Sequence, residues 1–276
     1  MESADRESFG KQLLAGILLI VLIVAFALSP LPGGDDWENL SAASRRVWTG
    51  QPLYTQAYHN PPWLAVALSP LGLLPQRLGW AIVSVTTLIV VSAVVRRWGG
   101  GLSTMALALL SPPILYTLLH GEIDGLILGG VLLPPEWWIL IGLTKPQVAI
   151  GLVFGIPRDR LVRAIVIAGL VLVASLLWFG LWPLRWLEQA NPLHQGWNLW
   201  AGLWPMQVPA GVLLILLGIS RKDERWLVAA SPFLSPYAAT SSLLGPWMVA
   251  CSFLKGWQAL VVLLAWWGAV VYRMAV

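Results

Sequence analysis

Residues 78–95 read LGWAIVSVTTLIVVSAVV, an unbroken run of 18 uncharged residues that is followed at once by Arg96 and Arg97. A helix that crosses a bilayer needs about 20 mostly apolar residues, so this run has the length and composition of a membrane span. Similar runs recur at 13–34, 98–121, 164–184, 206–220, 226–254 and 256–272. Because some of them are long enough to fold back, we expect an all-α polytopic membrane protein with about eight to ten transmembrane or broken helices.

The composition agrees with a membrane protein. Of 276 residues, 58% are hydrophobic and 11% are charged, whereas about 25% of the residues of a soluble domain are charged. The high apolar content excludes a disordered chain, and the single cysteine, Cys251, excludes a disulfide scaffold. The basic residues form short clusters between the apolar runs, which indicates membrane topology and gives no support to nucleic-acid binding.

The basic clusters predict the orientation of the chain. The positive-inside rule places three of them in the cytoplasm, at 96–97, 158–163 and 221–225. The first apolar run is longer than the core of a signal peptide, about 7 to 15 residues, so we expect a retained first helix with a cytoplasmic N-terminus in a bacterial-type plasma membrane. We expect one membrane domain, 1–276, with outer loops at 30–62 and 182–205. Segments 63–74 and 125–143 are too short to span simply, so each either spans with tilt or re-enters.

The first outer loop contains signals of a short helix. Asp35 or Asp36 can cap its N-terminus, Glu38 falls in the first turn, and Gly50 can end it. The pattern predicts an amphipathic helix that lies on the outer membrane surface.

Ionisable residues in or beside the apolar runs are the candidate site residues, because burying a charge at membrane depth is costly. Lys145 interrupts a strongly apolar stretch just before Pro146, and a lysine there indicates an anionic ligand. The other candidates are Glu122, Asp124 and Glu136 near the runs, and Asp35, Asp36, Arg45, Arg46, His59, Arg185, Glu188 and His194 in the loops. Each of these residues can instead have a purely structural role. The aspartates can cap a helix, Arg45 and Arg46 can lie on a solvated helix face, and Glu122 and Asp124 can lie in a water-exposed turn.

Other kinds of site have no sequence support. The chain lacks the glycine-rich nucleotide motifs, HExxH and Gly-x-Ser-x-Gly, and its three histidines are isolated, so we expect no metal or other cofactor. Five Ser-Pro steps predict kinked helices that line a cavity, which is also a feature of transporters.

Several short motifs follow one another in a characteristic order. They are Asp36, Gly50-Gln51-Pro52-Leu53-Tyr54, Pro61-Pro62, Gly121-Glu122-Ile123-Asp124, Leu143-Thr144-Lys145-Pro146-Gln147, Asn198-Leu199-Trp200 and Ser235-Pro236-Tyr237. The series resembles glycosyltransferase family 87, which comprises GT-C-fold membrane enzymes that use polyprenyl-phosphate sugars, often mannose, at the outer face of the membrane.

The resemblance implies roles for particular residues. Asp36, 14 residues before Gly50, falls where the family has its catalytic base, and Asp35 is the adjacent alternative. The further candidates for contacts with the substrates are Lys145, Gln147, Arg45, Arg46, His59, Glu122, Asp124, Arg185, His194 and Asn198. The implied partners are a polyprenyl-phosphate sugar, a lipid or glycan acceptor and membrane lipids.

The resemblance also implies a mechanism of sugar transfer. Asp36 would take the proton of the acceptor hydroxyl as this attacks the anomeric carbon, and Lys145 with Arg45, Arg46 or Arg185 would stabilise the departing phosphate. A single displacement inverts the anomeric centre. The alternatives are a membrane subunit or lipid-binding scaffold without catalytic activity, and a transporter.

Overall fold

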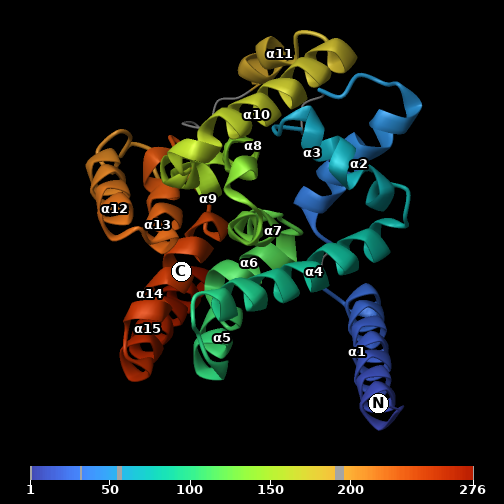
Figure 1. Cartoon of the computed structure of the whole chain (residues 1–276), viewed down its shortest axis with the longest axis vertical. Helices are drawn as coiled ribbons and strands as arrows, with labels where there is room; N and C mark the ends of the chain where they lie inside the picture. The colour runs from blue at the N-terminus through green and yellow to red at the C-terminus, as the bar shows by residue number, and fades with distance from the viewer. Residues whose placement is uncertain (1, 32, 55–57, 190–195, 276) are drawn as a thin grey trace.

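The computed structural model describes the backbone of residues 2–31, 33–54, 58–189 and 196–275, and the side chains of 12–31, 33–54, 58–188 and 196–273 (Figure 1). Within these residues the chain is all-helical, with no strand, as the apolar runs predict. The α-helices are α1 (Glu2–Leu28), α2 (Asp35–Thr49), α3 (Pro62–Gly72), α4 (Gln76–Arg97), α5 (Leu102–Leu109), α6 (Pro112–His120), α7 (Asp124–Leu128), α8 (Trp138–Thr144), α9 (Pro146–Ala149), α10 (Arg158–Phe179), α11 (Trp182–Gln189), α12 (Val208–Arg221), α13 (Glu224–Leu234), α14 (Leu244–Phe253) and α15 (Gly256–Ala275). Short 3-10 helices are η1 (Gly129–Leu132), η2 (Pro135–Trp137), η3 (Ile150–Gly155) and η5 (Ser241–Leu243).

Two helices, α4 and α10, are long and apolar enough to cross a membrane. Helices α5 and α6 meet the same criteria when they are counted together, as a third span, but this pair bends by 54° at the break formed by Leu110 and Ser111. The apolar run 226–254 is divided into two shorter helices, α13 and α14. Among the described residues, the all-helical architecture is therefore as expected, and two helices, or three if the bent pair is counted as one span, could cross a membrane by their length and composition.

Helix α2 forms as expected, but its start and its surroundings differ from the prediction. The N-cap is Gly34, with φ of +75°, and no side chain caps the helix, so the prediction that Asp35 or Asp36 is the N-cap is wrong. Both aspartates lie in the first turn, where carboxylates interact favourably with the helix dipole. Gly50 ends the helix with φ of +66°, as predicted.

The apolar face of α2 is packed inside the protein. Trp37 is fully buried, and its indole N–H donates to the carbonyl of Gln76 at 3.0 Å. Gly79 and Gly121 lie directly against the Trp37 side chain, since a Cβ on either would come within 2.6 Å of it. Burial of such a large ring fixes the start of α2 against α4 and the end of α6.

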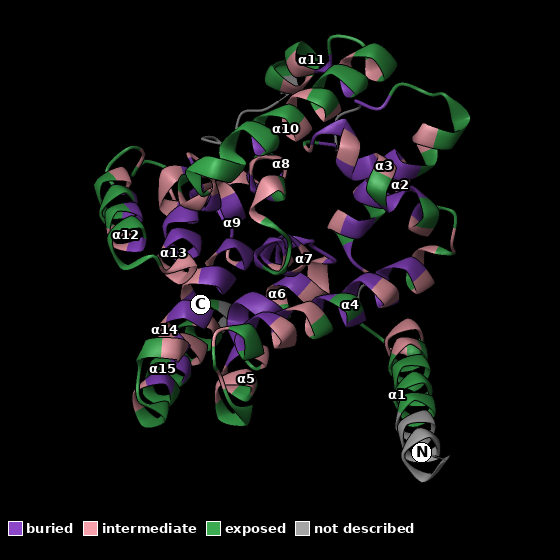
Figure 2. Cartoon of the chain, viewed as in Figure 1, coloured by how far each residue is buried: buried purple, intermediate pink, exposed green. Residues whose placement is uncertain are grey.

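The segments left open by the sequence form short helices, none of which is long enough to cross a bilayer by itself. Helix α3 has 11 residues and contains Pro70, and residues 124–155 form α7, η1, η2, α8, α9 and η3 in succession. Helix α7 packs against α4, where Gly125 leaves room for Thr87. Figure 2 shows that α7 and α9 are largely buried, so this broken chain forms the centre of the protein.

Exposed apolar side chains mark the faces that a bilayer would cover. In the most apolar 18-residue segment of α10 only 17% is buried. The described side chains of α1, α12 and α15 are also largely exposed (Figure 2). At the basic end of α4, Arg97 binds Glu224 of α13 at 2.8 Å. This ion pair joins two of the basic clusters that the sequence places on one side of the membrane.

Candidate functional site

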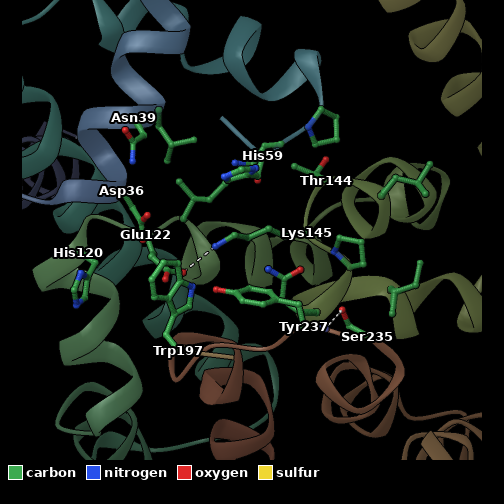
Figure 3. Close-up of a pocket in the computed structure, with 18 of the residues that line it drawn as sticks. Asp36, Asn39, His59, His120, Glu122, Thr144, Lys145, Trp197, Ser235 and Tyr237 are labelled. Carbon is green, nitrogen blue, oxygen red and sulfur yellow. Dashed lines mark hydrogen bonds and ion pairs between the residues drawn. The ribbon is translucent and has the colours of Figure 1, made fainter. Parts of the chain in front are cut away.

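A pocket of about 600 Å³ lies among α2, the end of α6, the break between α8 and α9, and the residues after α13. Figure 3 shows that side chains from these elements point toward one another across it. The polar and aromatic residues that line it are Asp35, Asp36, Asn39, His59, Asn60, Tyr116, His120, Glu122, Thr144, Lys145, Gln147, Trp186, Trp197, Ser235 and Tyr237. Helix breaks bring these residues together from distant parts of the sequence.

A buried ion-pair cluster forms one wall of the pocket. The Lys145 ammonium donates to Glu122 Oε2 at 2.8 Å and to Asp124 Oδ1, and the three side chains are only 14%, 7% and 1% exposed. The carboxylates are bound from their other side, because the hydroxyl of Ser241 donates to Glu122 at 2.7 Å and that of Ser242 donates to Asp124 at 3.2 Å. The alternative of a water-exposed turn at Glu122 and Asp124 is therefore wrong.

Local backbone geometry places the cluster. Gly121 has φ of +67° and ends α6, so the chain turns sharply and directs Glu122 toward Lys145. Lys145 itself lies between two helices, because Pro146 cannot continue α8 and instead begins α9. The Thr144 hydroxyl accepts a hydrogen bond from the Trp63 indole at 2.8 Å, which ties this break to α3.

Asp36 is the carboxylate of the first turn of α2 that faces this cluster (Figure 3). Burial raises its pKa to about 7. Repulsion by the Glu122 carboxylate raises this pKa further, and the opposing attraction of Lys145 is the smaller of the two effects. A carboxylic acid with a pKa near 7 is poised to exchange a proton at neutral pH.

His120 and Asp35 form a second polar pair at the pocket that the sequence analysis did not identify. His120 Nδ1 lies 2.8 Å from Asp35 Oδ1, and the imidazole ring lies 4.1 Å from the ring of Tyr116, measured between centroids. The two side chains are 35% and 73% exposed, so the pair lies at the edge of the pocket. The only sequence signal is the position of His120 directly before the Gly121 turn.

The remaining candidates differ in whether they line the pocket. His59 and Gln147 line the pocket, and the His59 carbonyl accepts a hydrogen bond from the Trp186 indole at 2.7 Å. Burial lowers the pKa of His59, which favours its neutral form. Arg45, Arg46 and Arg185 do not line the pocket, and His194 lies outside the described residues.

Asn198 does not line the pocket but binds the backbone on both sides of Tyr237, which does. Its side chain donates to the Pro236 carbonyl at 3.0 Å and accepts from the Ala238 amide at 3.1 Å. These bonds hold the segment that carries Tyr237, a residue that lines the pocket. Asn198 is 5% exposed and is a positioning residue for that segment.

The described side chains include no group of three or more His, Cys, Asp or Glu residues that could hold a metal ion. The pocket thus combines a carboxyl group of raised pKa, a buried lysine held by two carboxylates, a histidine–carboxylate pair and several aromatic rings. No protein-family model, curated protein or solved structure matches the chain.

Proposed function

We propose that the chain is a membrane glycosyltransferase that moves a hexose, such as mannose, from a polyprenyl-phosphate donor to a hydroxyl of a lipid or glycan acceptor at the outer face of the membrane. In this proposal the short helices belong to a GT-C-like bundle. The observation that carries the proposal is the placement of Asp36 and Lys145 in one pocket within an otherwise apolar helical protein. The order of the sequence motifs, which resembles that of glycosyltransferase family 87, supports it.

Asp36 is the proposed general base. A base works best when its pKa is close to the pH at which the reaction runs, and the pKa of Asp36 is about 7. The ionised carboxylate accepts the proton of the acceptor hydroxyl while the oxygen of that hydroxyl bonds to the anomeric carbon. Because the leaving phosphate is already stable as an anion, no second carboxyl group is needed to protonate it, in contrast to glycoside hydrolysis.

Lys145 is the proposed contact of the leaving phosphate, through a directed hydrogen bond. An ammonium group has three N–H donors. Lys145 donates two of them to Glu122 and Asp124. The third is available to an oxygen atom in the pocket. The two carboxylates offset the charge of Lys145, so its contribution is orientation of the phosphate more than net positive charge.

Aromatic residues provide surfaces for the sugar. Trp186, Trp197 and Tyr237 line the pocket, and their rings can pack against the apolar faces of a hexose. The apolar walls at Leu143 and Ile150 can contact the first isoprene units of the donor. A volume of about 600 Å³ is within the range of pockets that hold ligands of this size.

The test uses the purified full-length chain in nanodiscs with radiolabelled polyprenyl-phosphate mannose and other hexoses as donors, together with a panel of hydroxyl-bearing lipids and glycans as acceptors. We expect the wild type to release the label from the donor lipid, and we expect Asp36→Asn to bind the donor without releasing it. A wild-type chain that binds the donors without consuming them would support a lipid-binding scaffold. Movement of a polar substrate across sealed vesicles without hydrolysis of any donor would support a transporter.

A further inference from the structure

A second hollow lies outside the candidate site, at the basic end of α10. It has a volume of about 490 Å³ and is formed by Pro134 and Trp137 on one side and Val162, Val166 and Ile167 on the other. Glu136 and Arg163 are its polar residues. None of these residues lines the candidate site.

The two charged residues of this groove, Glu136 and Arg163, differ in their contacts. Glu136 accepts two hydrogen bonds from Arg160, at 3.2 and 3.3 Å, so its charge is already compensated. Arg163 is exposed, and among the residues that the structure describes it forms no hydrogen bond or ion pair. Glu136 also attracts Arg163 electrostatically, without a direct contact. The groove therefore offers a guanidinium group whose hydrogen-bond donors are all unused within the described part of the chain, beside an apolar surface.

The position of the groove fits the headgroup region of a bilayer. Helix α10 is one of the two long apolar helices, and its side chains are mostly exposed from Val162 onward. Arg163 lies one to two turns from the start of this helix, where a spanning helix meets the lipid headgroups. Trp137, which is 41% exposed, has the amphipathic ring that is enriched at this depth.

We infer that this groove binds an anionic phospholipid of the bilayer, with its phosphate on Arg163 and an acyl chain along Val162, Val166 and Ile167. A phosphodiester with a long apolar chain complements a lone arginine at the end of an apolar groove. The lipid is distinct from the proposed sugar donor, because the groove and the candidate site share no lining residue. Arg163 of the groove also lies about 24 Å along the axis of α10 from Phe179, at the helix end that leads to Trp186 of the candidate site.

The test is a titration of the purified full-length chain in detergent, with bound lipids counted by native mass spectrometry. The probes are phosphatidylglycerol, phosphatidylcholine with the same acyl chains, and unlabelled polyprenyl phosphate. We expect the first phosphatidylglycerol to bind more tightly than the first phosphatidylcholine. We expect Arg163→Gln to weaken that binding about fivefold, as for one arginine near an anionic headgroup.

Two further variants separate this site from general charge attraction. Arg96→Gln removes an exposed arginine from the end of the other long helix, α4, and is expected to leave phosphatidylglycerol binding unchanged. Val166→Trp fills the groove from a half-exposed position and is expected to weaken binding of the lipid as Arg163→Gln does. Equal binding by wild type and Arg163→Gln would overturn the inference. An equal loss in Arg96→Gln, or tighter Arg163-dependent binding of polyprenyl phosphate, would overturn it too.

Discussion

The ammonium nitrogen of Lys145 lies 2.8 Å from Oε2 of Glu122, and both side chains are almost entirely buried. Asp124 binds the same ammonium group. A buried charge whose partner is removed costs several kcal/mol, so this cluster links the stability of the central broken helices to the chemistry of the pocket.

Replacement of Lys145 by Met therefore tests the cluster. We expect Lys145→Met to destabilise the protein by about 3 to 5 kcal/mol, because Glu122 and Asp124 lose their counter-ion in a buried site. The measurement is thermal unfolding in detergent near pH 7. The triple variant with Glu122→Gln and Asp124→Asn removes the uncompensated charges and should regain part of the loss. A single variant as stable as the wild type would show that the lysine is not buried with its partners.

The pKa of Asp36 predicts a pH dependence of stability. A folded-state pKa of about 7, against an ordinary aspartic acid value of 3.8 in the unfolded chain, means that the folded protein binds more protons than the unfolded chain between these two values. The contribution of Asp36 to stability is therefore full below about pH 4 and falls as the pH rises toward 7. We expect Asp36→Asn to unfold at a higher temperature than the wild type at pH 8, and at a similar temperature at pH 4. An equal difference at both pH values would contradict the shifted pKa.

Gly121 should tolerate no side chain. Its φ is +67°, and a Cβ would come within 2.6 Å of the Trp37 Cβ, so Gly121→Ala combines backbone strain with a steric clash. We expect a loss of about 2 to 4 kcal/mol. Gly99→Ala is the matched control, because Gly99 has φ of +80° but nothing within 4 Å of its Cβ position. The two variants are compared by thermal unfolding, and equal losses would contradict the close packing of Trp37.

His120 should contribute to the proposed reaction, whereas Arg185 should not. His120 lines the pocket and is held by Asp35, so His120→Gln is expected to lower kcat/KM by about 10- to 100-fold. Arg185 is exposed and does not line the pocket, so Arg185→Gln is expected to retain wild-type turnover. Donor turnover by both variants is the measurement. A larger loss in Arg185→Gln would instead indicate that arginines of the predicted outer loops bind the phosphate.

Much of the helical structure follows from local sequence signals. Gly50 ends α2 because it reaches a left-handed conformation without strain, and Pro146 separates α8 from α9 because it lacks a backbone donor. The motif alone does not predict Gly34 as the N-cap, because the need for glycine there depends on tertiary packing: a Cβ at Gly34 would come within 2.8 Å of the Trp80 side chain.

The site was predictable only in part, for a related reason. An ionisable residue in or beside an apolar run is a clear sequence signal, and it identifies Lys145, Glu122 and Asp124 as candidates. Neither the pairing of these three residues nor the contact between His120 and Asp35, 85 residues apart, has a local signal. Arg45, Arg46 and Arg185 were candidates by charge, but charge does not reveal which way a side chain faces.

The most direct test of the proposed function compares the two neighbouring aspartates of α2. Turnover of radiolabelled polyprenyl-phosphate sugars by Asp36→Asn and Asp35→Asn is measured from pH 5.5 to pH 8.5, beside the wild type. We expect wild-type kcat/KM to rise with pH through about 7 as Asp36 loses its proton. We expect Asp36→Asn to lose at least about 100-fold in turnover at every pH, and Asp35→Asn to keep the rise with pH at a reduced rate. A pH-dependent turnover that survives in Asp36→Asn would contradict the assignment of Asp36 as the base.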